Sequence, residues 1–580
     1  MRKKISIFNL YFKFFFYFKT KQKIRTIFSF VLGLLSSFLE LVSVGLIIPF
    51  VILIQNPEKI YEFDLYKTLV GNKLFLSNEL ILLFIFFFLG IIILSTILKL
   101  IHLKLNCIVS YDIIRTFSEI LFRRVLSQEF KTFENINTKD VVTTILLRSQ
   151  NIGESNFYII TLVTSLITVF FLLINIIYFT SSKIIFFLLG VNLLYFIFWR
   201  LIKKQVKYHS KIYSENFQKL NSNIIEMMGS FTNIILYKLH EFFLSDFKKN
   251  NDLLRTGLGQ ITFLTSYPAI IIQSLVLTIL VVLIYFFYSF EILNDQLPFL
   301  IMLVFSAQRI MPNVQTIFSS YTTLTYFKEN LKKFLLLLNL KIQNNKNFFN
   351  NSENIIQQEE FDKINFKNIK FSYNNRNKKI LFDDLNLEIK KGEKVALTGE
   401  SGSGKSTLIK IILGFLRPAT GHILVNGKKL EDHNLDWWHS KVAYIPQKIF
   451  VLDANLYENI SLKKNISRKE KEEINVLLKI LNLSKLSSYS KDGLRNFGGE
   501  DGKKFSGGQI QRIALARALF QKRKFIILDE AFNALDKKNI RNIMKILNNI
   551  SSLTILVITH SEEVINNFGK ILKIKNKKIY

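Results

Sequence analysis

The stretch Gly399-Glu-Ser-Gly-Ser-Gly-Lys-Ser406 has the spacing G-x-x-x-x-G-K-[ST], in which glycines precede a lysine and a hydroxyl residue. It follows the apolar run Val395–Leu397 and leads into Thr407–Leu413, a run with helical spacing. Glycines at such a place let backbone N–H groups curl around phosphate oxygens, and the start of a helix adds positive partial charge. We expect Lys405 to reach the terminal phosphates and Ser406 to bind Mg²⁺. The stretch therefore predicts a nucleotide site between a strand and a helix.

Two acidic residues add to this prediction. Asp529 and Glu530 follow Phe525–Leu528, a continuous apolar run that is typical of a buried parallel strand. The carboxyl ends of such strands are where open α/β sheets bind their ligands. We expect Asp529 to hold Mg²⁺ through water and Glu530 to polarise the water that attacks the γ-phosphate. The alternative, a pair of solvated loop acids, is disfavoured by the phosphate loop in the same chain.

The first 340 residues are of a different kind, because they contain six long stretches with at most one charge each. A helix that crosses a bilayer needs about 20 mostly apolar residues. We predict six membrane-spanning helices, near residues 24–55, 78–104, 157–182, 184–202, 257–290 and 296–328. The Asn-rich stretch 341–360 predicts a linker, and residues 361–580 then form the nucleotide-binding domain. A hydrophobic content of 49% and a mean hydropathy of +0.25 exclude an ordinary soluble enzyme and a disordered chain.

The excess and the placement of basic residues indicate what the chain binds and how its helices are oriented in the membrane. Lys and Arg number 77 against 44 for Asp and Glu, an excess of +33 that suits nucleic acid or an anionic membrane. The bilayer-length stretches favour the membrane and exclude nucleic acid. Basic residues gather before the first helix and in the second and fourth connections, so the positive-inside rule places both termini and both long connections in the cytoplasm. The single cysteine, Cys107, excludes a disulfide framework.

Further motifs follow in an order that resembles the ATP-binding cassette (ABC) transporters. Phe505-Ser-Gly-Gly-Gln509 is similar to the LSGGQ signature, with Phe in place of Leu. Asn533-Ala-Leu-Asp536 is similar to the D-loop, with Asn in place of Ser. The resemblance implies that Tyr373 stacks on adenine, that Gln447 senses Mg²⁺ and the attacking water, and that His560 donates to the γ-phosphate.

The resemblance thus assigns roles to three groups of residues. The expected catalytic residues are Glu530, His560 and Gln447, and the expected Mg²⁺ ligands are Ser406, Gln447 and Asp529. The residues expected to bind ATP are Tyr373, Gly399, Glu400, Ser401, Gly402, Ser403, Gly404, Lys405, Ser406, Thr407, Ser506, Gly507, Gly508 and Gln509. In this family the signature acts on the nucleotide of the partner subunit. A chain with one cassette therefore implies a homodimer that holds two ATP molecules.

Six helices ahead of one cassette resemble the exporter (type IV) architecture, and this resemblance covers nearly the whole chain. It implies an α-helical transmembrane domain with long cytoplasmic extensions, followed by an α/β P-loop domain. It also implies two short coupling helices, which we place near Asn137–Val141 and Gly229–Ile234. Phe8–Phe18 is either an amphipathic segment on the inner membrane face or an extension of the first helix.

Ionisable residues inside the membrane half are candidates for substrate contact, because their burial in lipid costs free energy. Glu40 lies in the first predicted helix, Arg309 in the sixth, and Lys99 at the inner end of the second. For Lys99 the alternative is snorkelling to the interface, and for Glu40 it is an ion pair or hydrogen bond between helices. Arg309, near the middle of its run, is the best candidate to meet an anionic group.

Two segments of the membrane half resemble PglK-type flippases of lipid-linked oligosaccharides. These are Glu40–Phe50, similar to their helix 1, and Arg309-Ile-Met-Pro312, similar to their helix 6. The connection Asn56–Phe75 is long enough for the short external helix of that group. Lys99 and Arg309 match two of the basic residues near the lipid diphosphate there, whereas a third basic position is Ala269 in this chain.

These observations predict an ATP-driven exporter or flippase in the inner (cytoplasmic) membrane. Its expected substrate is a lipid-linked oligosaccharide or similar glycolipid, and its expected partners are a second copy, the bilayer and this amphipathic lipid. An exporter of peptides or hydrophobic drugs with the same architecture is the first alternative. A membrane-anchored regulator or channel that uses ATP only as a switch is the second, and the presence of Glu530 and His560 disfavours it.

Overall fold

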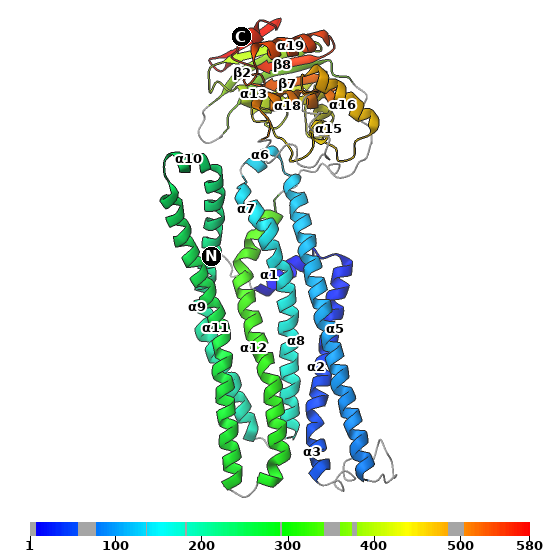
Figure 1. Ribbon diagram of the computed structural model, residues 1–580, viewed down its shortest axis with the longest axis vertical. Coiled ribbons are helices and arrows are strands. Elements are labelled where there is room, and N and C mark those ends of the chain that lie inside the picture. The colour runs from blue at the N-terminus through cyan, green and yellow to red at the C-terminus, as the bar shows by residue number, and fades with distance from the viewer. Residues whose placement is uncertain are drawn as a thin grey trace. The chain divides into compact units, whose positions relative to one another are not determined.

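The computed structural model describes residues 7–55, 77–134, 136–179, 183–289, 293–340, 360–373, 380–484 and 504–580, in two compact units (Figure 1). The helical unit comprises Met1–Gln128 and Asn135–Ile342, and the sheet unit comprises Glu129–Glu134 and Gln343–Tyr580. The external helix predicted within 56–75 lies outside the described residues. So do the linker predicted for 341–360, apart from Glu360, and the ends of two predicted helices, at residues 180–182 and 290.

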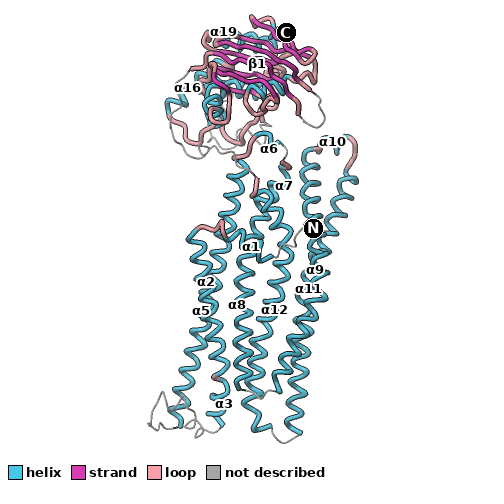
Figure 2. The backbone as a smooth tube through the Cα atoms, turned by 180° about the vertical axis from the view of Figure 1, so that it is seen from behind, coloured by secondary structure: helices cyan, strands magenta, loops and turns pink. Residues whose placement is uncertain are grey.

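The helical unit is built from helices of very different lengths (Figure 2). They are α1 (Ile7–Phe15), α2 (Thr20–Gly45), α3 (Ile47–Gln55), α5 (Ser77–Leu126), α7 (Thr138–Thr143), the π-helix η2 (Thr144–Arg148), α8 (Ser149–Phe179), α9 (Lys183–Gly229), α10 (Phe231–Leu236), α11 (His240–Ser289) and α12 (Leu293–Leu338). Within the described residues, four stretches are long and apolar enough to cross a membrane: Thr20–Val51, Ile81–Leu126, Asp140–Ile177 and His240–Phe286.

The other two predicted spans, 184–202 and 296–328, lie within α9 and α12, which contain 47 and 46 residues. At 1.5 Å per residue each of these helices is about 70 Å long, more than twice the thickness of a bilayer core. The long connections of the sequence are therefore largely continuous extensions of the helices, and α9 and α11 run side by side (Figure 1).

The N-terminal segment forms a helix of its own. α1 ends at Phe15, and α2 begins after Lys19, whose backbone N–H donates to Gln22 Oε1 at 3.0 Å. One face of α1 is buried, with the Phe14 ring packed edge-on against Phe117 and Phe334. Its other face exposes an aromatic row that includes Phe12. α1 is therefore a separate helix and not an extension of α2, while its predicted place on the inner membrane face stays a prediction.

The sheet unit contains two sheets (Figure 2). The four-stranded antiparallel sheet has the order β2-β1-β4-β5, and the six-stranded sheet has the order β10-β9-β3-β8-β7-β6, with parallel pairing from β9 to β6. The strands are β1 (Lys363–Phe371), β2 (Phe382–Lys390), β3 (Lys394–Gly399), β4 (Thr420–Val425), β5 (Lys428–Lys429), β6 (Val442–Ile445), β7 (Phe525–Asp529), β8 (Thr554–Ile558), β9 (Lys570–Lys575) and β10 (Lys578–Ile579).

Helices of the sheet unit accompany these strands. They are α6 (Phe130–Glu134), α13 (Lys405–Ile412), α14 (Leu435–Lys441), α15 (Leu456–Ser461), α16 (Arg468–Ile480), α18 (Gly507–Phe520), α19 (Lys537–Asn549) and α20 (Glu562–Ile565). Every residue of β7 and β8 is buried, as a continuous apolar run predicts for central parallel strands. The carboxyl ends of β3, β7 and β8 consequently meet at one edge of the sheet.

The segment Glu129–Glu134 belongs to the sheet unit although it lies far upstream in the chain. The Phe130 ring stacks on Phe415, with centroids 4.8 Å apart and an interplanar angle of 11°. Lys410 Nζ lies 2.7 Å from Glu134 Oε1. The predicted first coupling helix, Asn137–Val141, falls at the start of α7 in the helical unit, and its contact with the sheet unit stays a prediction. The aromatic residue Phe130, which the polar pattern of the sequence did not reveal, packs the segment Glu129–Glu134 against the sheet unit.

Candidate functional site

The phosphate loop lies between the end of β3 and the start of α13, as its sequence predicts. Gly402 and Gly404 have φ values of +80° and +104°, a region that side chains with a Cβ rarely adopt. A Cβ on Gly404 would also come within 2.8 Å of the Phe382 ring. Backbone conformation therefore favours glycine at both positions, and at Gly404 the lack of space does so as well.

Two polar groups of the loop are arranged as phosphate ligands. Ser403 Oγ is buried and has no hydrogen-bond partner within the described part of the chain. Lys405 Nζ donates to the backbone oxygens of Gly399 and Glu400, at 2.7 and 2.9 Å. A buried hydroxyl without a partner costs free energy, and a phosphate oxygen would satisfy it. The loop thus fits the nucleotide that its sequence predicts.

A cavity of about 570 Å³ opens beside this loop, a size typical of ligand sites. It brings together residues predicted to bind ATP or to act in its hydrolysis: Tyr373, Ser401, Gly402, Gly404, Lys405, Ser406, Thr407, Gln447, Glu530 and His560. Tyr373 is held by a hydrogen bond of 3.0 Å between its hydroxyl and that of Thr407. Leu381, which also lines the cavity, was not predicted, since nothing distinguishes it from a core residue.

The predicted metal ligands supply the oxygen atoms that Mg²⁺ prefers. Ser406 and Gln447 line the cavity, and Asp529 is the last residue of β7. Burial raises the pKa of the Asp529 carboxyl, and the Tyr444 hydroxyl, which donates to Asp529 Oδ2 at 3.2 Å, opposes this effect. Among the described residues, no group of three His, Cys, Asp or Glu side chains forms a metal site.

Glu530 is held by two amides that belong to different motifs. Gln447 Nε2 donates to Glu530 Oε2 at 2.8 Å, and Asn533 Nδ2 donates to the same oxygen at 3.0 Å. The backbone of Glu530 has a φ of +52°, which is uncommon for a residue with a side chain. Two donors on one oxygen orient the carboxylate that is expected to meet the attacking water. The contact of Asn533 was not predicted from the sequence, which indicated only an unusual residue at this place.

Replacing Asn533 with Leu removes this donor at similar volume. We expect kcat for ATP hydrolysis to fall about threefold and KM for ATP to change little, because one exposed hydrogen bond contributes about 1 kcal/mol or less. Steady-state phosphate release against ATP concentration measures both constants. The matched control is Asn566→Leu, at an exposed position of the same unit. An unchanged kcat, or a change confined to KM, would contradict a positioning role for Asn533.

The signature residues do not line this cavity in the described chain. Ser506 caps α18: its hydroxyl accepts from the Gln509 backbone N–H at 3.3 Å, and Gln509 Oε1 accepts from the Ser506 backbone N–H at 2.8 Å. A Cβ on Gly508 would come within 3.0 Å of the Ala534 carbonyl oxygen, so the signature packs closely on the predicted D-loop. This placement leaves the role of Ser506, Gly507, Gly508 and Gln509 toward nucleotide as a prediction.

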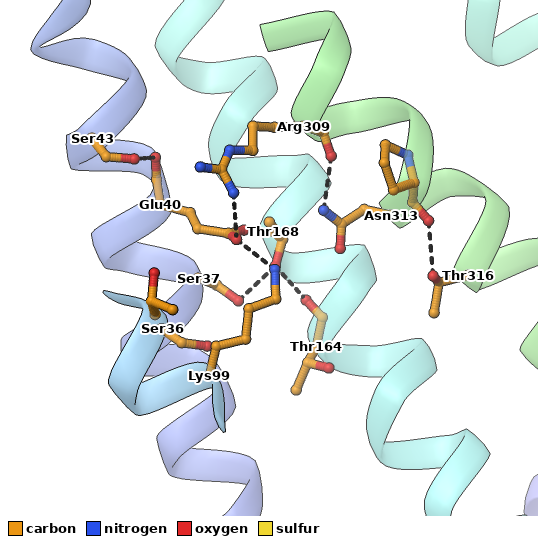
Figure 3. Close-up of polar contacts among 12 residues, drawn as sticks. Ser36, Ser37, Glu40, Ser43, Lys99, Thr164, Thr168, Arg309, Asn313 and Thr316 are labelled. Atoms are coloured by element: carbon orange, nitrogen blue, oxygen red, sulfur yellow. Dashed lines mark hydrogen bonds and ion pairs between the residues drawn. The ribbon is translucent and has the colours of Figure 1, made fainter. Parts of the chain in front are cut away.

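The helical unit brings together the three predicted substrate residues (Figure 3). Lys99 Nζ, on α5, lies 2.6 Å from Glu40 Oε1 on α2, and Arg309 Nη1, on α12, lies 3.7 Å from the same oxygen. The Glu40 side chain is 5% exposed, whereas those of Lys99 and Arg309 are 54% and 46% exposed. The interhelical ion pair considered for Glu40 is therefore present, and both cations take part in it.

Two family models match the chain. Residues 382–533 match the model described as ABC transporter, and residues 23–313, half of the chain, match the model described as ABC transporter transmembrane region.

Matches to curated relatives are shorter. An ATP-dependent lipid A-core flippase of Neisseria meningitidis serogroup B is 35% identical over 220 residues, which is 37% of this chain and 35% of the relative. The ATP-dependent permease MDL1 of Candida albicans is 38% identical over 213 residues, 36% of this chain and 31% of the relative. The chain thus matches about a third of the length of these relatives.

Among solved structures, a bacterial Atm1-family ABC exporter with ATP bound has a TM-score of 0.74 at 17% identity, with 96% of this chain and 94% of that chain covered. A likeness at this identity supports the fold alone. It confirms the expected fold class, a helical transmembrane domain together with an α/β nucleotide-binding domain.

Proposed function

The chain belongs to the ABC transporter family, and from this premise we propose that it is an ATP-driven exporter that moves an anionic glycolipid across the cytoplasmic membrane. The sheet unit is an ABC transporter ATPase domain, and the helical unit is a multi-pass membrane domain. Two copies form the working transporter, with both termini in the cytoplasm. A second copy is needed because the signature residues at the start of α18 stand apart from the cavity of their own subunit.

ATP hydrolysis follows from the arrangement around the cavity. Lys405 leaves the carbonyl oxygens of Gly399 and Glu400 and meets the terminal phosphates, and Ser403 gains the partner that its hydroxyl lacks. Glu530 orients and polarises the attacking water, while His560 donates to the γ-phosphate. Mg²⁺, held by Ser406, Gln447 and Asp529, would neutralise charge on the phosphate oxygens.

The observation that carries the substrate proposal is the cluster of Glu40, Lys99 and Arg309. A diphosphate has a large free-energy cost in a hydrocarbon environment unless cations pair with it. The Lys99 and Arg309 side chains are about half exposed, so such a group can approach both of them. The favoured substrate is therefore a polyprenyl-diphosphate-linked oligosaccharide or similar glycolipid. The flippase named for lipid A-core among the relatives is consistent with a lipid substrate.

Transfer of a fluorescent polyprenyl-diphosphate-linked oligosaccharide in proteoliposomes tests this proposal. We expect Arg309→Ala to lower the ATP-dependent transfer rate about fivefold or more, because a hydrogen bond to a charged group contributes about 1.5–3 kcal/mol before exposure weakens it. Basal ATP hydrolysis should stay within about twofold of wild type, since Arg309 lies in the helical unit.

The matched control is Lys104→Ala, which removes an exposed cation further along α5. It should leave both rates unchanged. Unaltered transfer by Arg309→Ala would refute the diphosphate contact. Stimulation of ATP hydrolysis by amphipathic peptides, with none by the diphosphate lipid, would favour the peptide or drug exporter instead.

A further inference from the structure

Glu40 is enclosed, whereas the two cations that it holds are open to their surroundings. Its side chain is 5% exposed, against 54% for Lys99 and 46% for Arg309, and both cations reach the same carboxylate oxygen. Figure 3 shows the carboxylate between α2 and the two cations, which come from α5 and α12. An anion that approaches Lys99 and Arg309 therefore competes with a carboxylate that is already in place.

Hydroxyl groups surround the cluster but do not satisfy the carboxylate. In the described chain, Ser37 Oγ donates to Gly33 O at 2.8 Å, Ser43 Oγ to Glu40 O at 2.9 Å, and Thr168 Oγ1 to Thr164 O at 3.0 Å. These bonds serve backbone carbonyls within the helices, and Ser37 Oγ also lies 2.6 Å from Thr168 Oγ1 between α2 and α8 (Figure 3). The charge of Glu40 is thus met by Lys99 and Arg309 alone among the described residues.

The charges of Glu40, Lys99 and Arg309 do not balance those of a bound diphosphate. The cluster holds one negative and two positive side chains, while a diphosphate diester carries two negative charges. When both cations turn to the diphosphate, Glu40 is left as a buried carboxylate without a cation, a state of high free energy unless it takes up a proton. The same imbalance favours the return of Lys99 and Arg309 to Glu40 once the diphosphate can leave.

We propose that Glu40 is a resident counter-ion, which the anionic headgroup displaces from Lys99 and Arg309 on binding and which reclaims both cations on release. This inference rests on the proposed glycolipid function. Glu40 then weakens substrate binding and accelerates substrate release, so a buried residue that does not bind the substrate sets the balance between affinity and turnover.

Glu40→Gln tests the proposal, because it keeps the size of the side chain and removes its charge. The measurement is ATP hydrolysis and transfer in proteoliposomes against the concentration of a polyprenyl-diphosphate-linked oligosaccharide. We expect the half-maximal concentration to fall about fivefold, because no carboxylate competes with the diphosphate. The maximal transfer rate should fall as well, because release loses the anion that reclaims the two cations. The uncharged polyprenol and inorganic pyrophosphate are the comparison ligands. Stimulation by pyrophosphate to the same extent would assign the site to the free anion and overturn the lipid assignment.

Glu40→Asp provides a second test in case the Gln variant does not fold. It keeps the negative charge but shortens the side chain by one methylene group. Its half-maximal concentration should lie between those of wild type and Glu40→Gln. Glu119→Gln, at an exposed i,i+4 pair with Arg123, is the matched control and should behave as wild type. If the diphosphate lipid stimulates wild type but neither Glu40 variant changes the half-maximal concentration, the counter-ion role is overturned and the proposed function stands. If wild type shows no stimulation, the proposed function fails and this inference fails with it.

Discussion

Replacing Glu530 with Gln is expected to lower steady-state ATP hydrolysis by about a hundred- to ten-thousandfold, which is the usual contribution of a positioned general base. Glu530 lines the nucleotide cavity at the end of β7 and receives hydrogen bonds from Gln447 and Asn533. Gln has the same shape, and its amide oxygen still accepts hydrogen bonds, so the site should keep its geometry. It lacks the negative charge that polarises water. ATP binding should therefore persist, as measured with a fluorescent ATP analogue beside phosphate release.

Glu562→Gln is the matched control, because Glu562 is an exposed acid shortly after His560 in the same unit. Its rate of hydrolysis should equal that of wild type. Near-normal turnover by Glu530→Gln would refute the assigned role of this carboxylate. Loss of ATP binding together with hydrolysis would instead indicate that Glu530 maintains the shape of the cavity.

Replacing Phe130 with Ala should reduce ATP-driven transfer about tenfold or more while ATP hydrolysis changes little. Phe130 stacks on Phe415 within the sheet unit, and its chain neighbours on both sides lead into the helical unit. Loss of a half-buried aromatic pair costs about 1–3 kcal/mol. Neither ring belongs to the nucleotide cavity within the described residues. The substitution should therefore loosen the segment Glu129–Glu134, whose chain continues into the helical unit, without altering the catalytic groups.

The ion pair beside this stack should contribute less to transfer than the stack does. Glu134→Gln removes the ion pair with Lys410. The Glu134 side chain is 46% exposed and that of Lys410 is 27% exposed. Partly exposed ion pairs contribute about 1 kcal/mol or less, so transfer should fall by less than about threefold. Phe130→Tyr, which keeps the ring, should preserve transfer. Normal transfer by Phe130→Ala, measured with hydrolysis in the same proteoliposomes, would show that the stack does not contribute to transfer.

The nucleotide site was predictable because its chemistry is local. The glycines, Lys405 and Ser406 are contiguous, and the strand before them and the helix after them are recognisable from their apolar patterns. Asp529 and Glu530 follow a strand whose burial on both faces is apparent from its composition. Tyr444 and Asn533 were missed as partners of these acids, since hydrogen bonds to Asp529 and Glu530 depend on how neighbouring segments pack.

The sequence by itself determined the two kinds of domain, the phosphate loop, the catalytic acids and the candidate residues in the membrane half. Only the tertiary structure decided that Lys99 and Arg309 share one oxygen of Glu40, and that Phe130 is the aromatic anchor of Glu129–Glu134. The physical reason is the uniformity of membrane helices. An apolar segment that is hydrophobic on every side has no pattern that tells which face turns toward its neighbours. Contacts between distant helices are therefore fixed by packing, whereas a loop that binds phosphate is specified by adjacent residues.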